Sequence, residues 1–156
     1  MIARCAGFVF ALAMLAGAPA LAAGVTIGGQ VQHPSTLTAE DLQKLPATTV
    51  PTSFQTDKGV ESASYTGALL WTVLANASPI DAAGKNARLR HVFLVKGSDG
   101  YVVSLSQGEI DPMFENKSVL LAYAKDGKPI DGIRLIVPGD KHGGRAVRDV
   151  VGIDVQ

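Results

Sequence analysis

Cysteine is almost absent from this sequence. The one cysteine among the 156 residues is Cys5, which lies in an apolar N-terminal stretch. If that stretch is removed as a leader, no thiol remains in the rest of the chain. The sequence therefore excludes a disulfide, a thiolate metal ligand and a cysteine nucleophile from the folded domain.

A surplus of charge of either sign is also missing. The chain has 14 Lys and Arg side chains against 14 Asp and Glu side chains. Proteins that bind nucleic acid or anionic membrane surfaces usually carry a basic patch or an overall positive charge. We therefore expect neither nucleic acid nor a membrane surface among the partners.

Histidine is scarce, and recognisable catalytic motifs are missing. His33, His91 and His142 lack the short spacing of metal-binding pairs, so we expect no metal held by protein ligands alone. His91 falls inside an expected strand, which favours a hydrogen-bonded structural role. Asp99 and Asp111 stand in "SDG" and "IDP", where aspartate is typical of turns. No catalytic residue can be assigned.

The N-terminus has the features of an export signal. Arg4 supplies a positive start, residues 6–17 are apolar, and Ala20-Leu21-Ala22 is a small-x-small cleavage pattern. Cleavage before Ala23 would leave residues 23–156, a length that suits a single domain. No second long apolar run follows, so we expect a periplasmic or secreted protein that is not anchored in a membrane.

The remaining sequence predicts an α+β fold, a mixed β-rich sheet with a few short helices. A short helix should begin after Thr38 as N-cap, and residues 67–77 have helical apolar spacing. Residues 48–56 contain Pro51, which confines that stretch to an edge or irregular strand. Further strands are expected over residues 25–31, 89–97, 101–106, 118–127, 133–138 and 145–155.

One stretch near the C-terminus gathers cations around flexible backbone. It reads "PGDKHGGRAVRDV" and places Lys141, His142, Arg145 and Arg148 around Gly143-Gly144. Backbone N–H groups and arginine side chains together suit an anion such as phosphate. A solvated hairpin turn would have the same composition, so both interpretations stay open on these residues alone.

Four segments, in order, resemble the sulfite-oxidase-like molybdopterin-binding domain. They are "YTGALLWTVLANA" (65–77), "GSDGYVVSLSQGEI" (97–110), "VLLAYAKDGKPI" (119–130) and "IRLIVPGDKHGGRAVRDVVGIDV" (133–155). The resemblance covers most of residues 38–155. It implies the α+β sulfite-oxidase fold and a cradle for molybdopterin, a pterin with a phosphate tail.

The resemblance also implies a set of cofactor-binding residues. By position these are basic residues of the last strand and loop, the glycine beside them and a tyrosine at the pocket mouth: Arg134, Lys141, His142, Gly143, Arg145, Arg148 and Tyr101. In the family a cysteine upstream of the aromatic-x-Gly helix ligates molybdenum. Here that stretch offers only the hydroxyls of Thr52, Ser53 and Thr56, which are harder donors than a thiolate.

Three functions follow from this combination. The chain is expected to be a degenerate pterin- or anion-binding module without the thiolate ligand, with a pterin or another phosphorylated small molecule as its partner. One alternative is an active molybdenum-dependent oxidoreductase acting on a small oxyanion or sulfoxide. The other is a periplasmic protein-interaction module that keeps only the fold, and it should expose an apolar patch around Phe54, Trp71 or Phe114.

Overall fold

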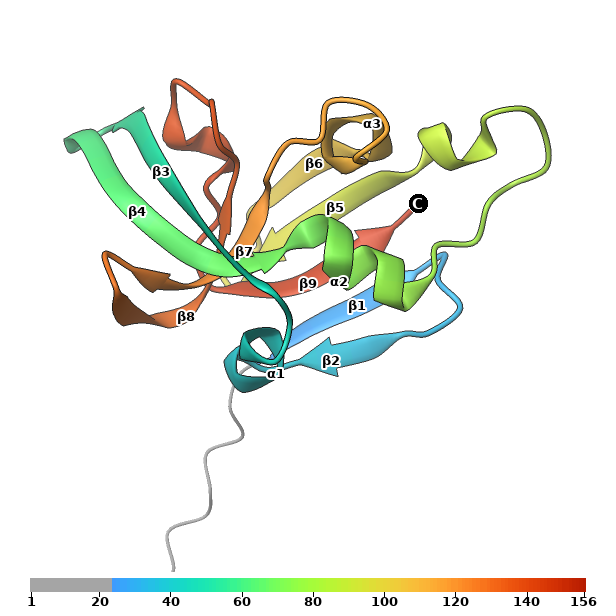
Figure 1. Ribbon diagram of the computed structural model, residues 1–156, viewed down its shortest axis with the longest axis horizontal. Coiled ribbons are helices and arrows are strands. Elements are labelled where there is room, and N and C mark those ends of the chain that lie inside the picture. The colour runs from blue at the N-terminus through green and yellow to red at the C-terminus, as the bar shows by residue number, and fades with distance from the viewer. Residues whose placement is uncertain (1–23) are drawn as a thin grey trace, which may run out of the picture.

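Two β-sheets form the framework of residues 24–156, the part of the chain that the computed structural model describes (Figure 1). The proposed export signal and Cys5 lie outside these residues. The first sheet has the order β2-β1-β9-β5-β6, with bounds Ser35–Leu37, Val25–Gly29, Val150–Val155, Val92–Gly97 and Val102–Ser106. The second has the order β3-β4-β7-β8, with bounds Ala47–Thr56, Gly59–Leu69, Leu120–Lys125 and Lys128–Ile136.

The pairing within the sheets joins distant parts of the chain. β1 and β9 run parallel, with Thr26 opposite Gly152, while every other pair of neighbouring strands is antiparallel. The first and the last strand of the described chain therefore lie side by side in one sheet. Such non-local pairing cannot form until both ends of the domain are present.

Helix α1 (Ala39–Gln43) begins as predicted. The Thr38 hydroxyl accepts a hydrogen bond from the Asp41 N–H at 3.2 Å, and the Asp41 carboxylate accepts one from the Thr38 N–H at 3.1 Å. This reciprocal capping box satisfies two N–H groups that a helix start leaves without partners. Asp41 and Glu40 also place negative charge at the positive end of the helix dipole.

Helix α2 begins later than the apolar spacing predicts. It covers Leu70–Ala77, whereas residues 67–69 continue strand β4. The reason is tertiary: Gly67, Ala68 and Leu69 pair with β7, and the Leu70 N–H donates to the Val119 carbonyl at 2.8 Å. Sheet pairing thus overrides helical spacing for three residues.

Two predicted strands are also shorter than expected. Residues 87–90 form a 3-10 turn, η1 (Ala87–Arg90), so the strand after it begins at Val92 rather than at residue 89. A second 3-10 turn, η2 (Gly143–Arg145), replaces the start of the strand predicted over 145–155. The prediction for β3 is confirmed, because it is an edge strand that contains Pro51 and pairs only with β4.

The main apolar core joins α2 and the strands β1, β5, β6 and β9 of the five-stranded sheet, and it also includes residues of β4, β7 and β8. Leu70, Val73 and Leu74 of the helix pack with Phe93, Ile153 and other buried strand residues. Burying each such side chain contributes about 1.5–3 kcal/mol relative to exposure. Val95, Val103 and Val150 belong to this core, so it holds in place the ends of β5, β6 and β9 at which they lie.

The chain crosses from one sheet to the other after β8. β8 belongs to the four-stranded sheet and β9 to the five-stranded sheet, and residues 137–149 connect them. The alternative of a hairpin turn over residues 138–150 is therefore wrong, because the two strands are not neighbours. We call residues 137–149 the crossover loop.

In residues 24–156 we find no helix both long and apolar enough to cross a membrane.

Candidate functional site

A cavity of about 540 Å³ lies between the crossover loop and the end of the β3–β4 hairpin. The hairpin supplies the wall from Phe54 to Lys58, and the crossover loop supplies residues 142–144 and 146–148. Asp99 and Tyr101, from the turn before β6, and Arg134 of β8 complete it. The site therefore gathers residues that are separated by up to 94 positions, Phe54 to Arg148.

Three contacts fix the crossover loop at this place. The Gln55 N–H donates to the Lys141 carbonyl at 2.9 Å, and the Tyr101 hydroxyl donates to the Gly144 carbonyl at 2.8 Å. Gly143 lies over the ring of Phe54, where an added Cβ would stand only 3.0 Å from a ring carbon. Glycine at 143 thus lets the loop backbone approach the hairpin closely.

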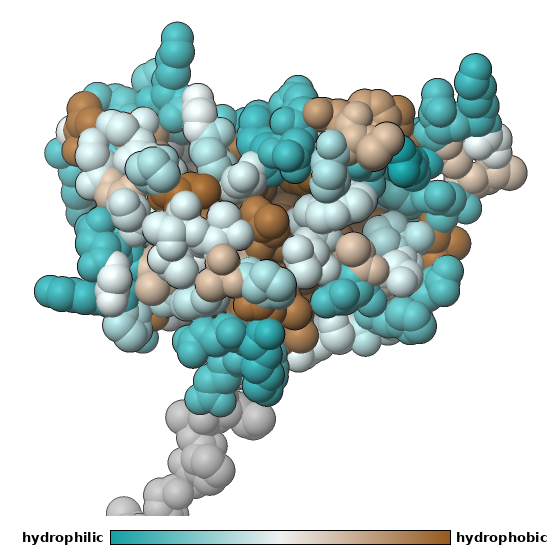
Figure 2. All heavy atoms as spheres, viewed as in Figure 1, coloured by the Kyte–Doolittle hydropathy of each residue, from teal (hydrophilic) through white to brown (hydrophobic). Residues whose placement is uncertain are grey.

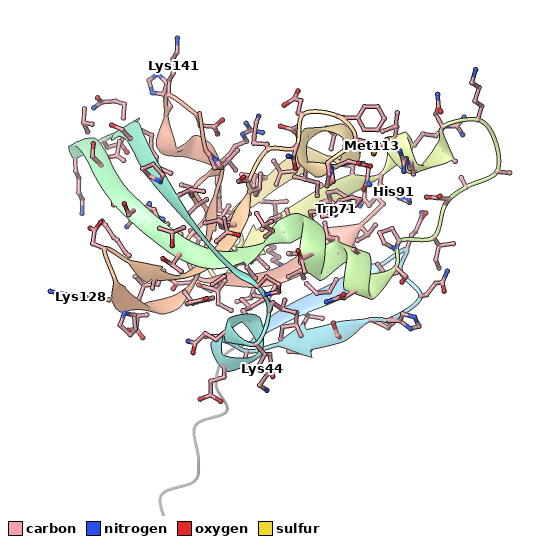
Figure 3. The ribbon with its side chains drawn as sticks, viewed as in Figure 1. Lys44, Trp71, His91, Met113, Lys128 and Lys141 are labelled. Atoms are coloured by element: carbon pink, nitrogen blue, oxygen red, sulfur yellow. The ribbon has the colours of Figure 1, made fainter. Side chains whose placement is uncertain are left out.

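Five of the seven predicted site residues line the cavity. They are Tyr101, Arg134, His142, Gly143 and Arg148. Lys141 and Arg145 do not. Figure 3 shows Lys141 pointing away from the body of the protein at the outer end of the loop.

Arg145 has a structural position in the loop. Its Nε and Nη2 donate to Asp140 at 2.9 and 2.6 Å, and its Nη1 donates to Glu109 Oε1 at 2.8 Å. The Asp140 carboxylate beside it is the main cause of a raised pKa for Arg145. Both ends of this guanidinium are committed to protein carboxylates, so Arg145 ties the crossover loop to helix α3 (Gln107–Ile110).

Arg134 reaches the cavity but its charge is balanced inside the protein. Its Nη1 donates to Glu61 Oε1 at 2.9 Å and to the Tyr65 hydroxyl at 2.6 Å, while its Nη2 donates to Glu61 Oε2 at 3.3 Å. The guanidinium also lies 5.7 Å from the ring centre of Phe54 and 5.2 Å from that of Tyr65. Among residues 24–156, its buried Nε has no hydrogen-bond acceptor.

Glu61 is the partner that sequence inspection misses. Hydrogen bonding from Arg134 is the main cause that lowers its pKa from 4.5 to about 2, helped by Tyr65 and Lys125. Burial is the main cause that raises the pKa of Tyr65. The sequence does contain a signal that could have located Glu61. A long β3–β4 hairpin with its turn at residues 57–58 places Glu61 opposite Phe54.

The lowered pKa of Glu61 predicts acid-sensitive stability. Glu61 has a lower pKa in the folded protein than in the unfolded chain, so its contribution is present above pH 4.5 and is lost as the pH falls toward 2. The shift corresponds to about 3 kcal/mol. Urea unfolding at a series of pH values should show this loss.

The control for this experiment is Glu61→Gln, because Asp41 also has a pKa of about 2 and titrates in the same window. We expect the profile of the variant to be flatter than that of the native protein by about the Glu61 contribution. Two profiles that fall in parallel between pH 5 and pH 2 would contradict the assignment.

Three further basic side chains line the cavity besides Arg134: Lys58, His142 and Arg148. Their acidic neighbours are Asp57 and Asp99, and Asp99 accepts a hydrogen bond from the Tyr101 N–H at 2.9 Å, as expected of a turn former. Sequence inspection missed Lys58, because its position at the cavity depends on the turn between β3 and β4. The arrangement is chemically suited to hold an anion.

The described residues offer little for a metal. No three His, Cys, Asp or Glu side chains converge on a possible metal position within residues 24–156. Of the hydroxyls near the family's cysteine position, Thr56 alone lines the cavity, and it donates to the Gly59 carbonyl at 2.8 Å. The Ser53 hydroxyl pairs with that of Ser62 at 2.8 Å on the exposed side of the hairpin.

A family model matches almost the whole chain. Residues 22–156 match the family model described as "Oxidoreductase molybdopterin binding domain". The chain belongs to this family. Membership confirms the resemblance read from the four sequence segments and accounts for the α+β architecture.

A solved member of the fold supports the same architecture. The crystal structure of the sulfane dehydrogenase SoxCD from Paracoccus pantotrophus matches with a TM-score of 0.69 and 22% identity. The match covers 85% of this chain and 37% of that chain, so the molybdopterin-binding domain here spans little more than a third of the length of that protein. A comparison with curated proteins finds no match.

The residues present fit one part of the cofactor that the family implies. Lys58, His142 and Arg148 beside the Gly143-Gly144 backbone suit a phosphate group. The hydroxyls of Ser53 and Thr56, in the stretch that corresponds to the family's cysteine, are already engaged in the hairpin and are poor replacements for a thiolate. The fit is therefore with the anionic tail of the pterin and not with protein ligation of molybdenum.

Proposed function

We propose that this chain is an exported anion-binding member of the molybdopterin-binding family. Its cavity would hold the phosphate of a pterin, or another phosphorylated small molecule, without a protein thiolate on a metal. The observation that carries the proposal is the convergence of Lys58, His142 and Arg148 on one cavity beside a glycine-rich loop. The leader pattern of residues 1–22 supports a periplasmic or secreted location.

The charge balance of the cavity supports this function. Within residues 24–156, Lys58 and Arg148 form no ion pair with a carboxylate, in contrast to Arg134 and Arg145. Their charges are therefore available to a ligand. Arg134 contributes a fixed guanidinium whose Nε lacks an acceptor, but its two terminal nitrogens already face Glu61.

The experiment that tests the function is a cofactor analysis of the protein purified from its native periplasm. Molybdenum and tungsten would be measured together with the fluorescence of any acid-released pterin. We expect pterin or bound phosphate with far less than one metal per chain. Stoichiometric molybdenum would overturn the proposal in favour of an active oxidoreductase.

Arg148→Ala is expected to weaken anion binding without weakening the fold. A charge-assisted hydrogen bond contributes about 1.5–3 kcal/mol, so the affinity for inorganic pyrophosphate should fall about 10- to 100-fold. The Arg148 side chain is exposed, so the unfolding temperature without ligand should hardly change. Calorimetric titration and thermal melts would measure the two quantities.

Lys128→Ala is the matched control for Arg148→Ala. Lys128 is also an exposed cation, but it lies on β8 away from the cavity (Figure 3). Its removal should leave the pyrophosphate affinity unchanged. Equal losses in both variants would show a non-specific effect of net charge and would count against a built anion site.

A further inference from the structure

A second surface, separate from the anion cavity, protrudes just after helix α3. Met113 is 75% exposed and Phe114 is 49% exposed. Figure 2 shows light-brown apolar spheres gathered over α3 and the loop that follows, with hydrophilic atoms on both sides. Single exposed apolar side chains are ordinary, but an adjacent methionine and phenylalanine on one turn are not.

The turn that carries these two side chains is held rigidly. Asp111 is buried, and its carboxylate accepts the Met113 N–H at 2.8 Å and the Gln107 amide at 3.2 Å. The Asp111 carbonyl accepts the N–H groups of Phe114 and Asn116 at 2.9 and 3.2 Å. A pre-ordered turn loses little conformational entropy when a partner binds.

Positive charge lies on the η1 side of the apolar pair. The Arg88 guanidinium lies 5.7 Å from the ring centre of Phe114, and its Nε is 3.9 Å from Asp111. Arg90 of η1 and Lys85 of the loop before it are exposed and form no ion pair within the part of the chain that the structure describes.

The exposed acids near this surface are already paired. Glu115 faces Lys117 at 3.4 Å, and Asp81 binds the buried His91 at 2.8 Å, which confirms the structural role predicted for that histidine. The surface around Phe114 is therefore apolar at its centre and cationic on the η1 side.

We propose that Met113, Phe114 and Arg88 form the docking surface for an acidic segment of a partner protein. An apolar side chain of that segment would pack on Met113 and Phe114, while its carboxylates face Arg88, Lys85 and Arg90. Methionine, phenylalanine and arginine are enriched at interface centres, and complementary charge fixes the partner and its orientation. A two-fold dimer through this surface would bring Arg88 toward its own copy, which disfavours a second copy as the occupant.

The methyl group of Met113 can report peptide binding at this surface. The methionines of the chain are Met1, Met14 and Met113, so a protein with its leader removed keeps Met113 alone among them. The processed protein would be labelled at its methionine methyl groups and titrated with two synthetic peptides. One peptide carries Leu and Trp among Asp and Glu residues, and the other has Lys in place of every acid.

We expect the acidic peptide to shift the Met113 methyl signal and the basic peptide to leave it in place. Phe114→Ser and Arg90→Glu should each weaken the binding at least about tenfold, and added salt should weaken it further. Val60→Ala is the matched control, because Val60 is 68% exposed but lies on the β3–β4 hairpin. A shift that depends on protein concentration without peptide would overturn the proposal in favour of self-association.

A crosslinking experiment in the exporting cells tests the surface with its natural partner. A photoreactive phenylalanine analogue at position 114 should capture a protein that the same analogue at position 60 does not. That protein, once purified, should bind Arg90→Glu at least about tenfold more weakly than the unmodified chain. Equal affinity for both would contradict the charge-based docking.

Discussion

Replacing Glu61 by glutamine is expected to cost about 3 kcal/mol of the free energy of unfolding at pH 7. The substitution leaves the Arg134 guanidinium, whose side chain is only 12% exposed, without its countercharge. A glutamine can accept one hydrogen bond from Arg134 but cannot offset its charge. Removing one member of a buried ion pair is far more destabilising than removing both, because the remaining charge stays desolvated.

Glu115→Gln is the matched control for this substitution. Glu115 is also a glutamate within an ion pair, 3.4 Å from Lys117, but 61% of its side chain is exposed. An exposed pair contributes at most about 1 kcal/mol. Urea denaturation of both variants would give the difference, and two equal, small losses would show that the Glu61–Arg134 pair does not support the fold.

Replacing Gly67 by alanine is expected to destabilise the protein by about 3 kcal/mol or more. An added Cβ at this position would overlap the Leu121 carbonyl oxygen and would lie 2.6 Å from the Ala122 Cα. Both are backbone atoms of β7, so no side-chain rotation can relieve the overlap. The β4–β7 pairing shifts its register between Thr66 and Gly67, and it would have to separate there.

Gly28→Ala controls for the general effect of adding a methyl group to a strand glycine. Gly28 lies in β1, and an added Cβ there meets no atom within 4 Å. Thermal melts followed by circular dichroism should show a large drop for Gly67→Ala and a change of a few degrees at most for Gly28→Ala. Similar melting temperatures for the two variants would refute the close approach of β4 to β7.

Local features of the fold could be predicted from the sequence, while the assembly of the strands could not. The N-cap at Thr38 and the edge or irregular strand required by Pro51 depend on neighbouring residues and on the chemistry of single side chains. The distribution of strands over two sheets depends on pairing between distant segments. For this reason the sequence of residues 138–150 is compatible with a hairpin turn, although β8 and β9 lie in different sheets.

In the candidate site, too, the local features could be predicted from the sequence and the long-range contacts could not. The cations of the crossover loop stand out in the sequence, and His142 and Arg148 do reach the cavity. Their neighbours do not stand out, because the Arg134–Glu61 pair joins residues 73 positions apart and depends on the register across β4, β7 and β8. Arg145 and Arg148 have similar settings in the sequence, yet Asp140 and Glu109 engage Arg145 and not Arg148 in the described part of the fold.

The charged side chains that line the cavity stand outside the apolar core. Lys58, His142 and Arg148 stand on the hairpin turn and the crossover loop, whereas the main core cluster contains none of these positions. Ligand chemistry can therefore drift under mutation while the architecture is inherited unchanged. A lineage that loses a metal-binding side chain on the hairpin keeps a stable scaffold, and selection can adapt that scaffold to a new small molecule.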